Sequence, residues 1–217
     1  MFFETPFEIW TYYACVMNTK AIELNNLRKF TDGELIVESI SGREDSFEEL
    51  VRRYQRPIVN YVFRMLGNYD SSLDVTQEIF IKVYNSMSKY SAEYKFSTWL
   101  YKISHNAAID HLRRHNNHVQ SLEVEGEDGA YQLQFESKRP SPEKEREYSE
   151  WRQEIESVVK CLPTGYRELI VLRHTQDLSY DEIADVTNLP LGTVKNRLFR
   201  AREMMREMFV ERGFTGI

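Results

Sequence analysis

Residues 178–205 constrain the fold more than any other part of this chain, because they have the pattern of two helices separated by a short turn. Ser179 and Glu182 have the three-residue spacing of a capping box, which starts a helix. Asn188 tolerates the positive φ that a turn needs, and Pro190 cannot continue the first helix. A cation-rich second helix follows directly. The stretch therefore predicts a helix-turn-helix of the kind that reads DNA.

The second helix of this pair has an apolar face and a polar face. Val194, Leu198, Ala201 and Met205 recur at helical spacing, and we expect them to point inward. Arginine can bond guanine bidentately, asparagine can do so to adenine, and lysine can neutralise phosphate. The predicted DNA-contacting residues are Thr193, Lys195, Asn196, Arg197, Arg200 and Arg202. A solvated amphipathic helix with surface arginines is the alternative, and the capping box and the turn argue against it.

Charge supports a local rather than a general affinity for nucleic acid. The 217-residue chain has a net charge of −6, but residues 188–212 hold six cations and three anions, a balance of +3. The field that matters for DNA binding is local. We therefore expect the chain to bind DNA through this helix and not as a general nucleic-acid coat.

Helical patterns dominate the rest of the chain, which predicts an all-α protein of two small helical domains. We place the first domain at residues 27–116, a flexible acidic linker at 117–140, and the second domain, which contains the helix-turn-helix, at 141–217. In the first domain we expect helices to start at Thr31, with Glu34, at Ser46, at Ser71 and near Ser97. In the second domain Trp151 is expected to enlarge a small core.

The linker and the N-terminus lack the apolar periodicity of a packed helix. Residues 120–150 hold nine acids and four bases, with Gly and Pro among them, although Tyr131, Leu133 and Phe135 are unusual in a pure spacer. Residues 1–26 are expected to be an N-terminal extension, either disordered or a docking segment, or to contain a mis-assigned start. We favour a mis-assigned start, with the true one at Met17.

Composition limits the location and the chemistry of the protein. No apolar run is long enough to cross a membrane, so no membrane insertion is expected. Two cysteines far apart in sequence predict neither a disulfide framework nor a thiolate metal site, and they suggest a reducing, cytoplasmic location. No glycine-rich phosphate loop or nucleophile motif is present. We therefore expect no enzyme activity, no cofactor and no metal.

Two predicted helices of the first domain carry side chains that packing alone does not explain. One presents Asp74, Gln77, Glu78 and Lys82 on its polar side. The other mixes rings with cations, a combination that suits unstacked bases on ring faces and phosphates beside the cations. The residues predicted to contact single-stranded DNA, some from their chemistry and some from the resemblance described next, are Lys95, Phe96, Ser97, Trp99, Asn106, Asp110, Arg113 and Arg114.

The order of three motifs resembles that of the extracytoplasmic-function (ECF) sigma factors of bacterial RNA polymerase, members of the sigma-70 family. D-V-T-Q-E-I-F, residues 74–80, is similar to the helix of that family that docks on the polymerase clamp. Residues 96–114 are similar to the segment that melts and reads the −10 element, and residues 179–203 to the reader of the −35 element. Thr187 and Asn188 replace the family's more usual Leu-Gly at the turn.

This resemblance implies a function and a set of partners. The chain would bind RNA polymerase core at the β′ clamp and the β flap, with Asp74, Gln77, Glu78 and Lys82 on the clamp. It would recognise promoter DNA as duplex at −35 and as single strand at −10, trapping a flipped base with the 88–95 segment and residues near Asn106. The linker would run toward the polymerase cleft. An anti-sigma factor would hold the protein inactive until a stress releases it.

Two other interpretations remain open at this point. A stand-alone helix-turn-helix repressor or activator with an N-terminal sensing domain would bind duplex DNA without polymerase, usually as a dimer, and does not account for the polar helix at residues 74–82. A metal site would rest on His105, His111, His115 and His118, of which His111 and His115 are four residues apart. The histidines are better interpreted as polar or phosphate-contacting groups at a helix end.

Overall fold

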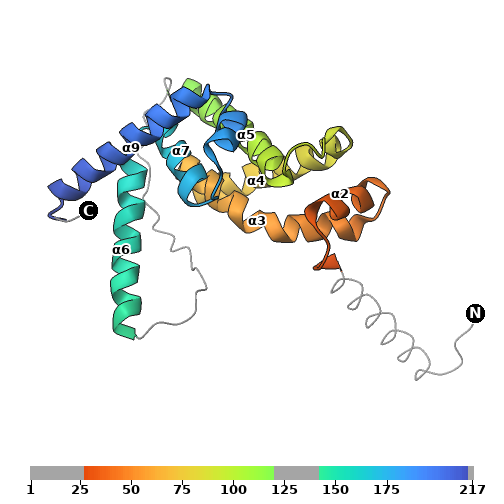
Figure 1. Cartoon of the computed structure of the whole chain (residues 1–217), viewed down its shortest axis with the longest axis horizontal. Helices are drawn as coiled ribbons and strands as arrows, with labels where there is room; N and C mark the ends of the chain where they lie inside the picture. Colours follow the sequence, from red (N-terminus) through yellow and green to blue (C-terminus); the bar gives the residue numbers. More distant parts are fainter. Residues whose placement is uncertain (1–26, 120–141, 215–217) are drawn as a thin grey trace, which may run out of the picture. The chain divides into compact units, whose positions relative to one another are not determined.

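The computed structural model describes residues 27–119 and 142–214, and every long regular element in these ranges is an α-helix (Figure 1). This confirms the all-α prediction. The predicted extension at residues 1–26 and most of the predicted linker, residues 120–140, lie outside the described residues. The elements in order are α2 (Asp32–Ile40), α3 (Glu44–Leu66), α4 (Tyr69–Ser86), the 3₁₀ turn η1 (Met87–Lys89), α5 (Phe96–Val119), α6 (Pro142–Cys161), α7 (Thr164–His174), α8 (Tyr180–Thr187) and α9 (Leu191–Glu211).

Residue contacts divide the chain into two compact units. The first comprises the chain up to Arg56 together with Phe80–Phe96, and the second comprises Pro57–Ile79 together with Ser97–Ile217. Helices α3 and α4 each run from one unit into the other. The domain limits expected from the sequence, 27–116 and 141–217, remain a prediction.

The first unit begins at the predicted capping box. The Thr31 side chain accepts from the Glu34 backbone N–H at 3.3 Å, and the Glu34 carboxylate accepts from the Thr31 N–H at 2.6 Å. The predicted start of α3 at Ser46 is wrong. The helix begins at Glu44, and Ser46 is buried inside it. Glu44 and Asp45 occupy the first turn, where carboxylates are stabilised by the helix dipole.

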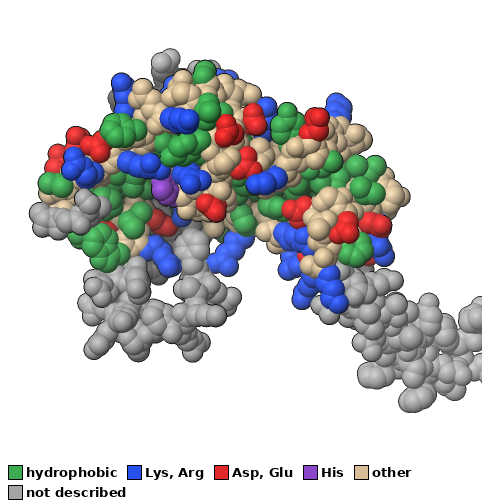
Figure 2. Space-filling model, in the orientation of Figure 1, with side chains coloured by type: hydrophobic (Ala, Val, Ile, Leu, Met, Phe, Trp, Pro, Cys, Tyr) green, Lys and Arg blue, Asp and Glu red, His purple; other side chains and the backbone are tan. Residues whose placement is uncertain are grey.

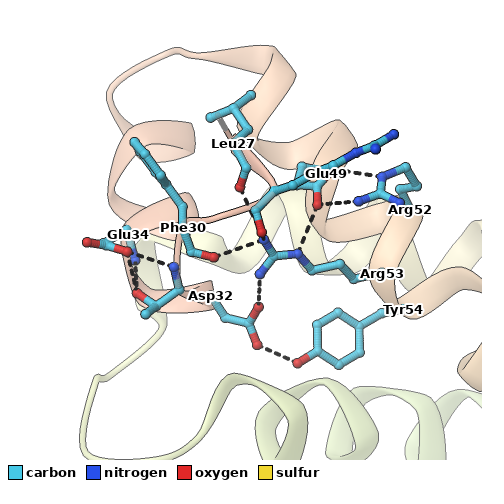
Figure 3. A network of polar contacts seen from close by, with 10 residues as sticks. Leu27, Phe30, Asp32, Glu34, Glu49, Arg52, Arg53 and Tyr54 are labelled. Carbon is cyan, nitrogen blue, oxygen red and sulfur yellow. Dashed lines mark hydrogen bonds and ion pairs between the residues drawn. The ribbon is translucent and has the colours of Figure 1, made fainter. Parts of the chain in front are cut away.

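Arg53 of α3 ties the start of the described chain to this unit (Figure 3). Its guanidinium donates to the carbonyls of Leu27, Arg28 and Phe30 at 2.9–3.1 Å. It also pairs with the carboxylates of Asp32 and Glu49 at 2.9 and 3.0 Å. One side chain therefore satisfies three carbonyl oxygens that would otherwise need water or another donor, and it fixes the entry into α2.

Glycine and asparagine form the junction between α3 and α4. Gly67 has a φ of +76°, a left-handed conformation that favours glycine, and α3 ends just before it. The predicted cap of α4 at Ser71 is wrong, because Asn68 takes that role. Its Oδ1 accepts from the Ser71 N–H at 2.9 Å, so α4 starts at Tyr69.

In the second unit the C-terminal helices share an apolar core. Val158 of α6 is buried, as is Leu162 just after that helix. Leu169 and Leu172 of α7, Ile183 of α8 and Leu198 of α9 are also buried. The expected core role of Trp151 is not found. That side chain is 39% exposed and its ring lies 4.8 Å from the ring of Phe214.

A buried carboxylate connects three helices of the second unit. Glu168 of α7 accepts from the Tyr61 hydroxyl of α3 at 2.6 Å and also contacts His105 Nδ1 of α5. Tyr61 and Glu168 are both buried. Burial, followed by the charge of Glu168, raises the pKa of Tyr61 well above its usual value. The hydroxyl therefore stays protonated and donates to the carboxylate.

Candidate nucleic-acid interface

The structure forms the helix-turn-helix where the sequence predicts it. Ser179 and Glu182 make the capping box of α8, with reciprocal bonds of 3.2 and 2.8 Å. Asn188 ends α8 with a φ of +54°, the left-handed conformation expected of it. Pro190 is the N-cap of α9. The turn between α8 and α9 is therefore three residues long, and the first amides of α9 form an end that favours anions.

The inner face of α9 is buried along most of its predicted stripe. Val194, Leu198 and Ala201 are inaccessible, whereas Met205 is only half-buried. The helix is also longer than the short one expected, because it continues to Glu211. The helix packs on α7 and α8, and this packing fixes the direction of its outer face.

The predicted DNA-contacting side chains of α9 fall into two groups. Lys195, Asn196 and Arg200 are exposed, and Asn196 and Arg200 are four positions apart, so they lie on the same side of the helix. Thr193 and Arg197 are half-buried, and the Arg197 guanidinium lies near Gly165 of α7, 3.6 Å from where a Cβ there would stand. The exposed group has the donors that read bases and neutralise phosphate.

Arg202 lies at the flank of this face. It contacts the Tyr180 hydroxyl at 3.4 Å and the His174 Nε2 at 3.5 Å. Burial and the neighbouring cations Arg202 and Arg173 lower the pKa of His174. These contacts hold Arg202 toward α7 and α8, so it is better placed for a phosphate at the edge than for a base.

The sequence analysis missed an aromatic side chain on α9. Phe199 is 64% exposed and lies between Asn196 and Arg200. Its position was recognisable, because residue 199 falls outside the stripe formed by residues 194, 198 and 201. An exposed ring beside base-reading donors can contact a thymine methyl group.

The residues predicted to contact single-stranded DNA lie on α5 and just before it. Trp99, Asn106, Asp110 and Arg113 follow one another at spacings of seven, four and three residues, which places them on one side of the helix. Asn106, Asp110, Arg113 and Arg114 are exposed, and Ser97 and Trp99 are half-buried. Arg113 lies 3.9 Å from Asp110, and Arg114 donates to the Asp110 carbonyl at 3.3 Å.

Phe96 differs from the other members of this set. It is only 3% exposed, and its ring packs edge-on against Tyr54 and Tyr90. A base has no access to this ring in the structure. Lys95, the residue before it, is exposed.

The polar side chains predicted on the third helix share an outer face of α4. Asp74, Gln77, Glu78 and Lys82 are all exposed. Ile81 lies on the same face, three residues after Glu78, and is 61% exposed. The sequence analysis did not select Ile81, although it is out of phase with the inner stripe of Val75, Ile79 and Val83. An apolar side chain ringed by polar ones is typical of a protein-binding surface.

The histidine pair on α5 does not have the surroundings of a metal site. The rings of His111 and His115 are stacked with centroids 5.7 Å apart, so they share one face as expected. Burial, followed by the neighbouring His115 and Arg114 side chains, lowers the pKa of His111. Among the described residues no group of three metal-binding side chains is found.

Cations and carboxylates are interspersed on the face of the molecule shown in Figure 2.

Two family models match the chain, and their order along the sequence is that of the surfaces described above. Sigma-70 region 2 matches residues 50–118, which hold the outer face of α4 and the α5 set. Sigma-70 region 4 matches residues 152–205, which hold the helix-turn-helix. The fold and these sites define a transcription initiation factor of the sigma-70 type.

Relatives identify the group within that type. The chain is 36% identical over 168 residues to the ECF RNA polymerase sigma factor SigW of Bacillus subtilis, covering 76% of this chain and 90% of SigW. It is 35% identical over 180 residues to the ECF RNA polymerase sigma-E factor of Escherichia coli K12, covering 81% of this chain and 92% of that protein. The chain belongs to the ECF RNA polymerase sigma factors.

Solved structures support the fold. The structure is similar to that of CnrH in complex with the cytosolic domain of CnrY, with a TM-score of 0.59 at 22% identity over 83% of this chain and 97% of that chain. It is also similar to the sigma factor RpoE of Bartonella quintana in complex with the anti-sigma factor NepR. The TM-score there is 0.61 at 19% identity, over 75% of this chain and 96% of that chain.

Within the described ranges, no helix is long and apolar enough to cross a membrane.

Proposed function

We propose that this sigma factor directs RNA polymerase core to promoters by reading a −35 element with α9 and an opened −10 element with α5 and the preceding loop. The observation that carries this proposal is the order of three exposed surfaces along one chain. A polar face on α4, an aromatic and basic face on α5 and a cationic recognition helix follow each other as they do in the family.

The −35 element is read by the outer face of α9. Asn196 and Arg200 supply base-edge contacts in the major groove, and Lys195 and Arg202 supply phosphate contacts. Thr193 and Arg197, which are half-buried, line the same helix and complete the set. The helix is held by buried residues on its opposite side, so its register on the groove is fixed by packing on α7 and α8.

The −10 element is opened and held by α5. Trp99 offers part of its ring to an unstacked base, and Asn106 and Asp110 offer hydrogen bonds to base edges further along the same side. Arg113, Arg114 and Lys95 neutralise phosphates, and Ser97 lies beside Lys95 at the start of the helix. Phe96 supports this surface from beneath because it is buried.

Polymerase core binds the outer face of α4. Asp74, Gln77, Glu78 and Lys82 surround Ile81, so a partner can bury an apolar side chain at the centre and satisfy polar groups at the rim. In the family this partner is the β′ clamp, and the β flap binds the C-terminal domain. An anti-sigma factor that covers the same faces would keep the protein inactive until a stress signal.

The protein acts without chemistry of its own and without a cofactor or metal, because polymerase supplies the catalysis. Its place is the cytoplasm, where polymerase and the chromosome are found.

Run-off transcription with purified polymerase core tests this function. Core supplemented with the full chain should give a discrete transcript from promoters that core alone does not use. Transcription should need the intact −35 and −10 elements of those promoters.

A stand-alone repressor would give the opposite result. It would bind duplex operator DNA tightly without polymerase and would not co-elute with core in gel filtration. That outcome would reject the proposal.

A further inference from the structure

Residues 90–95 form the loop between η1 and α5, and the side chain of Tyr90, its first residue, closes it. The Tyr90 hydroxyl donates to the Tyr94 carbonyl at 2.6 Å. The Tyr94 N–H donates to the Ser91 carbonyl at 3.3 Å, which makes a turn inside the loop. Every side chain from residue 91 to residue 95 is exposed. Burial of these side chains therefore contributes little to the loop conformation, and the Tyr90 hydrogen bond matters correspondingly more.

The Tyr90 ring rests on a rigid support. It packs edge-on against Phe96 at 6.1 Å, and Phe96 packs edge-on against Tyr54 at 5.3 Å. The Tyr54 hydroxyl bonds to Asp32, whose other carboxylate oxygen pairs with Arg53 at 2.9 Å. Figure 3 shows Asp32 between the Arg53 guanidinium and the Tyr54 ring. The Tyr54 ring therefore supports the Phe96 ring, and the Phe96 ring supports the Tyr90 ring, whose hydroxyl closes the loop.

The Tyr90 hydroxyl is in the protonated form that a hydrogen-bond donor needs. Burial raises the pKa of its hydroxyl, and the charge of Asp32 raises it further. The phenol is therefore protonated at neutral pH. It can therefore donate to the Tyr94 carbonyl.

We propose that Tyr90 is a positioning residue, which holds the 90–95 loop in the conformation that accepts an unpaired base of the opened promoter strand. The inference rests on the proposed function, because it assigns that base to this loop. An exposed loop that must be ordered on binding loses affinity to conformational entropy, and a loop that is already ordered avoids that loss. Tyr90 itself need not touch the DNA.

The test combines Tyr90→Phe with abasic substitution in the non-template strand. Tyr90→Phe keeps the ring on Phe96 and removes only the hydroxyl. Full-length wild-type and variant proteins are assembled with polymerase core, and their affinities are measured for forked templates of a promoter that the wild-type holoenzyme transcribes. Single abasic sites are placed in turn through the −10 element. The coupling between the two changes is then read as in a double-mutant cycle.

At one or two positions an abasic site should cause a large loss of affinity in the wild-type complex. In the Tyr90→Phe complex that loss should be about two- to tenfold smaller, which is the range that one neutral hydrogen bond supplies. At all other positions the two proteins should respond alike. The coupling compares two templates with one protein preparation, so a lower content of folded protein does not change it.

Tyr54→Phe is the matched control. It removes a hydroxyl from the neighbouring ring of the same cluster but leaves the loop bond between Tyr90 and Tyr94 in place. It should show no coupling to any abasic site, even if its melting temperature falls. Equal coupling in both variants, or none in Tyr90→Phe, would overturn the proposal and leave Tyr90 a purely structural residue.

These experiments distinguish failure of the proposed sigma function from failure of the role proposed for Tyr90. If the wild-type chain gives no promoter-specific transcript with core, the sigma activity itself is refuted. If the transcript is present and the abasic response of Tyr90→Phe equals that of wild type at every position, only the role of Tyr90 is refuted.

Discussion

Arg53 shows how one side chain can fix the start of a fold. Its five contacts are to three carbonyls and two carboxylates, and they span residues that are 4 to 26 positions away in sequence. Lysine keeps the charge but cannot supply five donors in a planar arrangement. We predict that Arg53→Lys lowers the free energy of unfolding by about 1–3 kcal/mol, because the part-buried carbonyl oxygens of Leu27 and Phe30 lose their donor.

Urea unfolding of the full chain at neutral pH measures this loss. Arg52→Lys is the matched control, because Arg52 pairs with the same Glu49 but its side chain is half-exposed. Glu49 is buried, but lysine keeps a positive charge beside it and Arg53 still donates to it, so the control should lose less stability than Arg53→Lys. Equal losses in both variants would show that the carbonyl contacts of Arg53 contribute nothing.

Arg200 is the side chain of α9 best placed to read a base, since it is exposed and lies one turn beyond Asn196. We predict that Arg200→Ala weakens −35 recognition by the holoenzyme by about 1–3 kcal/mol and relaxes selectivity at one or two base positions. Binding to promoters with single −35 substitutions measures this.

Arg206→Ala serves as the control on the same helix. Its guanidinium pairs with Glu203 at 3.3 Å, about two turns further from the start of α9. A uniform loss for Arg200→Ala across all sequences, with a shallower salt dependence, would show that Arg200 contacts only a phosphate.

At the scale of the element, α4 separates an inner apolar stripe from an outer polar face. Gln77 and Glu78 are exposed, so the packing of the helix does not depend on them. We predict that the double substitution Gln77→Lys, Glu78→Lys weakens binding to polymerase core by about tenfold, equal to about 1.4 kcal/mol, and leaves helical content unchanged. Fluorescence titration of labelled protein with core, together with circular dichroism, measures both quantities.

The double substitution Glu48→Lys, Gln55→Lys on α3 is a control with the same +3 change in net charge. Both residues are exposed and lie outside the α4 face. Should it weaken core binding as much as the α4 variant does, the effect would come from overall charge and α4 would lose its assigned role.

The accuracy of the sequence predictions depends on how far apart the interacting groups lie in the chain. The Thr31 and Ser179 capping boxes, and the left-handed Asn188, were predicted correctly because each involves groups within four residues. The family resemblance identified the three surfaces from local motifs in the same way. These features need no knowledge of the tertiary structure.

Features that depend on distant partners were predicted poorly. Ser46 has the sequence of a cap but is buried, and Phe96 was assigned to DNA although Tyr54, 42 residues earlier, covers it. Trp151 was expected in the core and is exposed. Neither the Arg53 network nor the contacts of Glu168 could be predicted, because periodicity shows which face is buried but not what covers it.

At the scale of the whole molecule, the Glu168 contacts join the segments matched by the two family models. Tyr61 and His105 lie within residues 50–118 and Glu168 lies within residues 152–205, so this buried cluster links the two segments inside one contact unit. The pKa of Tyr61 is raised in the folded state by burial and by the charge of Glu168. The unfolded chain releases the same proton near the ordinary tyrosine pKa of about 10.

The sign of the pH dependence follows from this difference. Below about pH 10 both states keep the proton, and the stabilising contribution of the hydroxyl is fully present. Above about pH 10 the unfolded state loses its proton first, so stability falls as pH rises. We predict that the free energy of unfolding of the full chain declines between about pH 9.5 and pH 11, and that Tyr61→Phe makes this decline shallower.

At neutral pH the same variant should be about 1–3 kcal/mol less stable, because Glu168 loses a donor while it remains buried. Urea unfolding at a series of pH values measures both effects, and Tyr166→Phe, a half-buried tyrosine on α7, is the control. An unchanged alkaline slope in Tyr61→Phe, with wild-type stability at neutral pH, would show that the Tyr61 hydroxyl does not support Glu168 in solution.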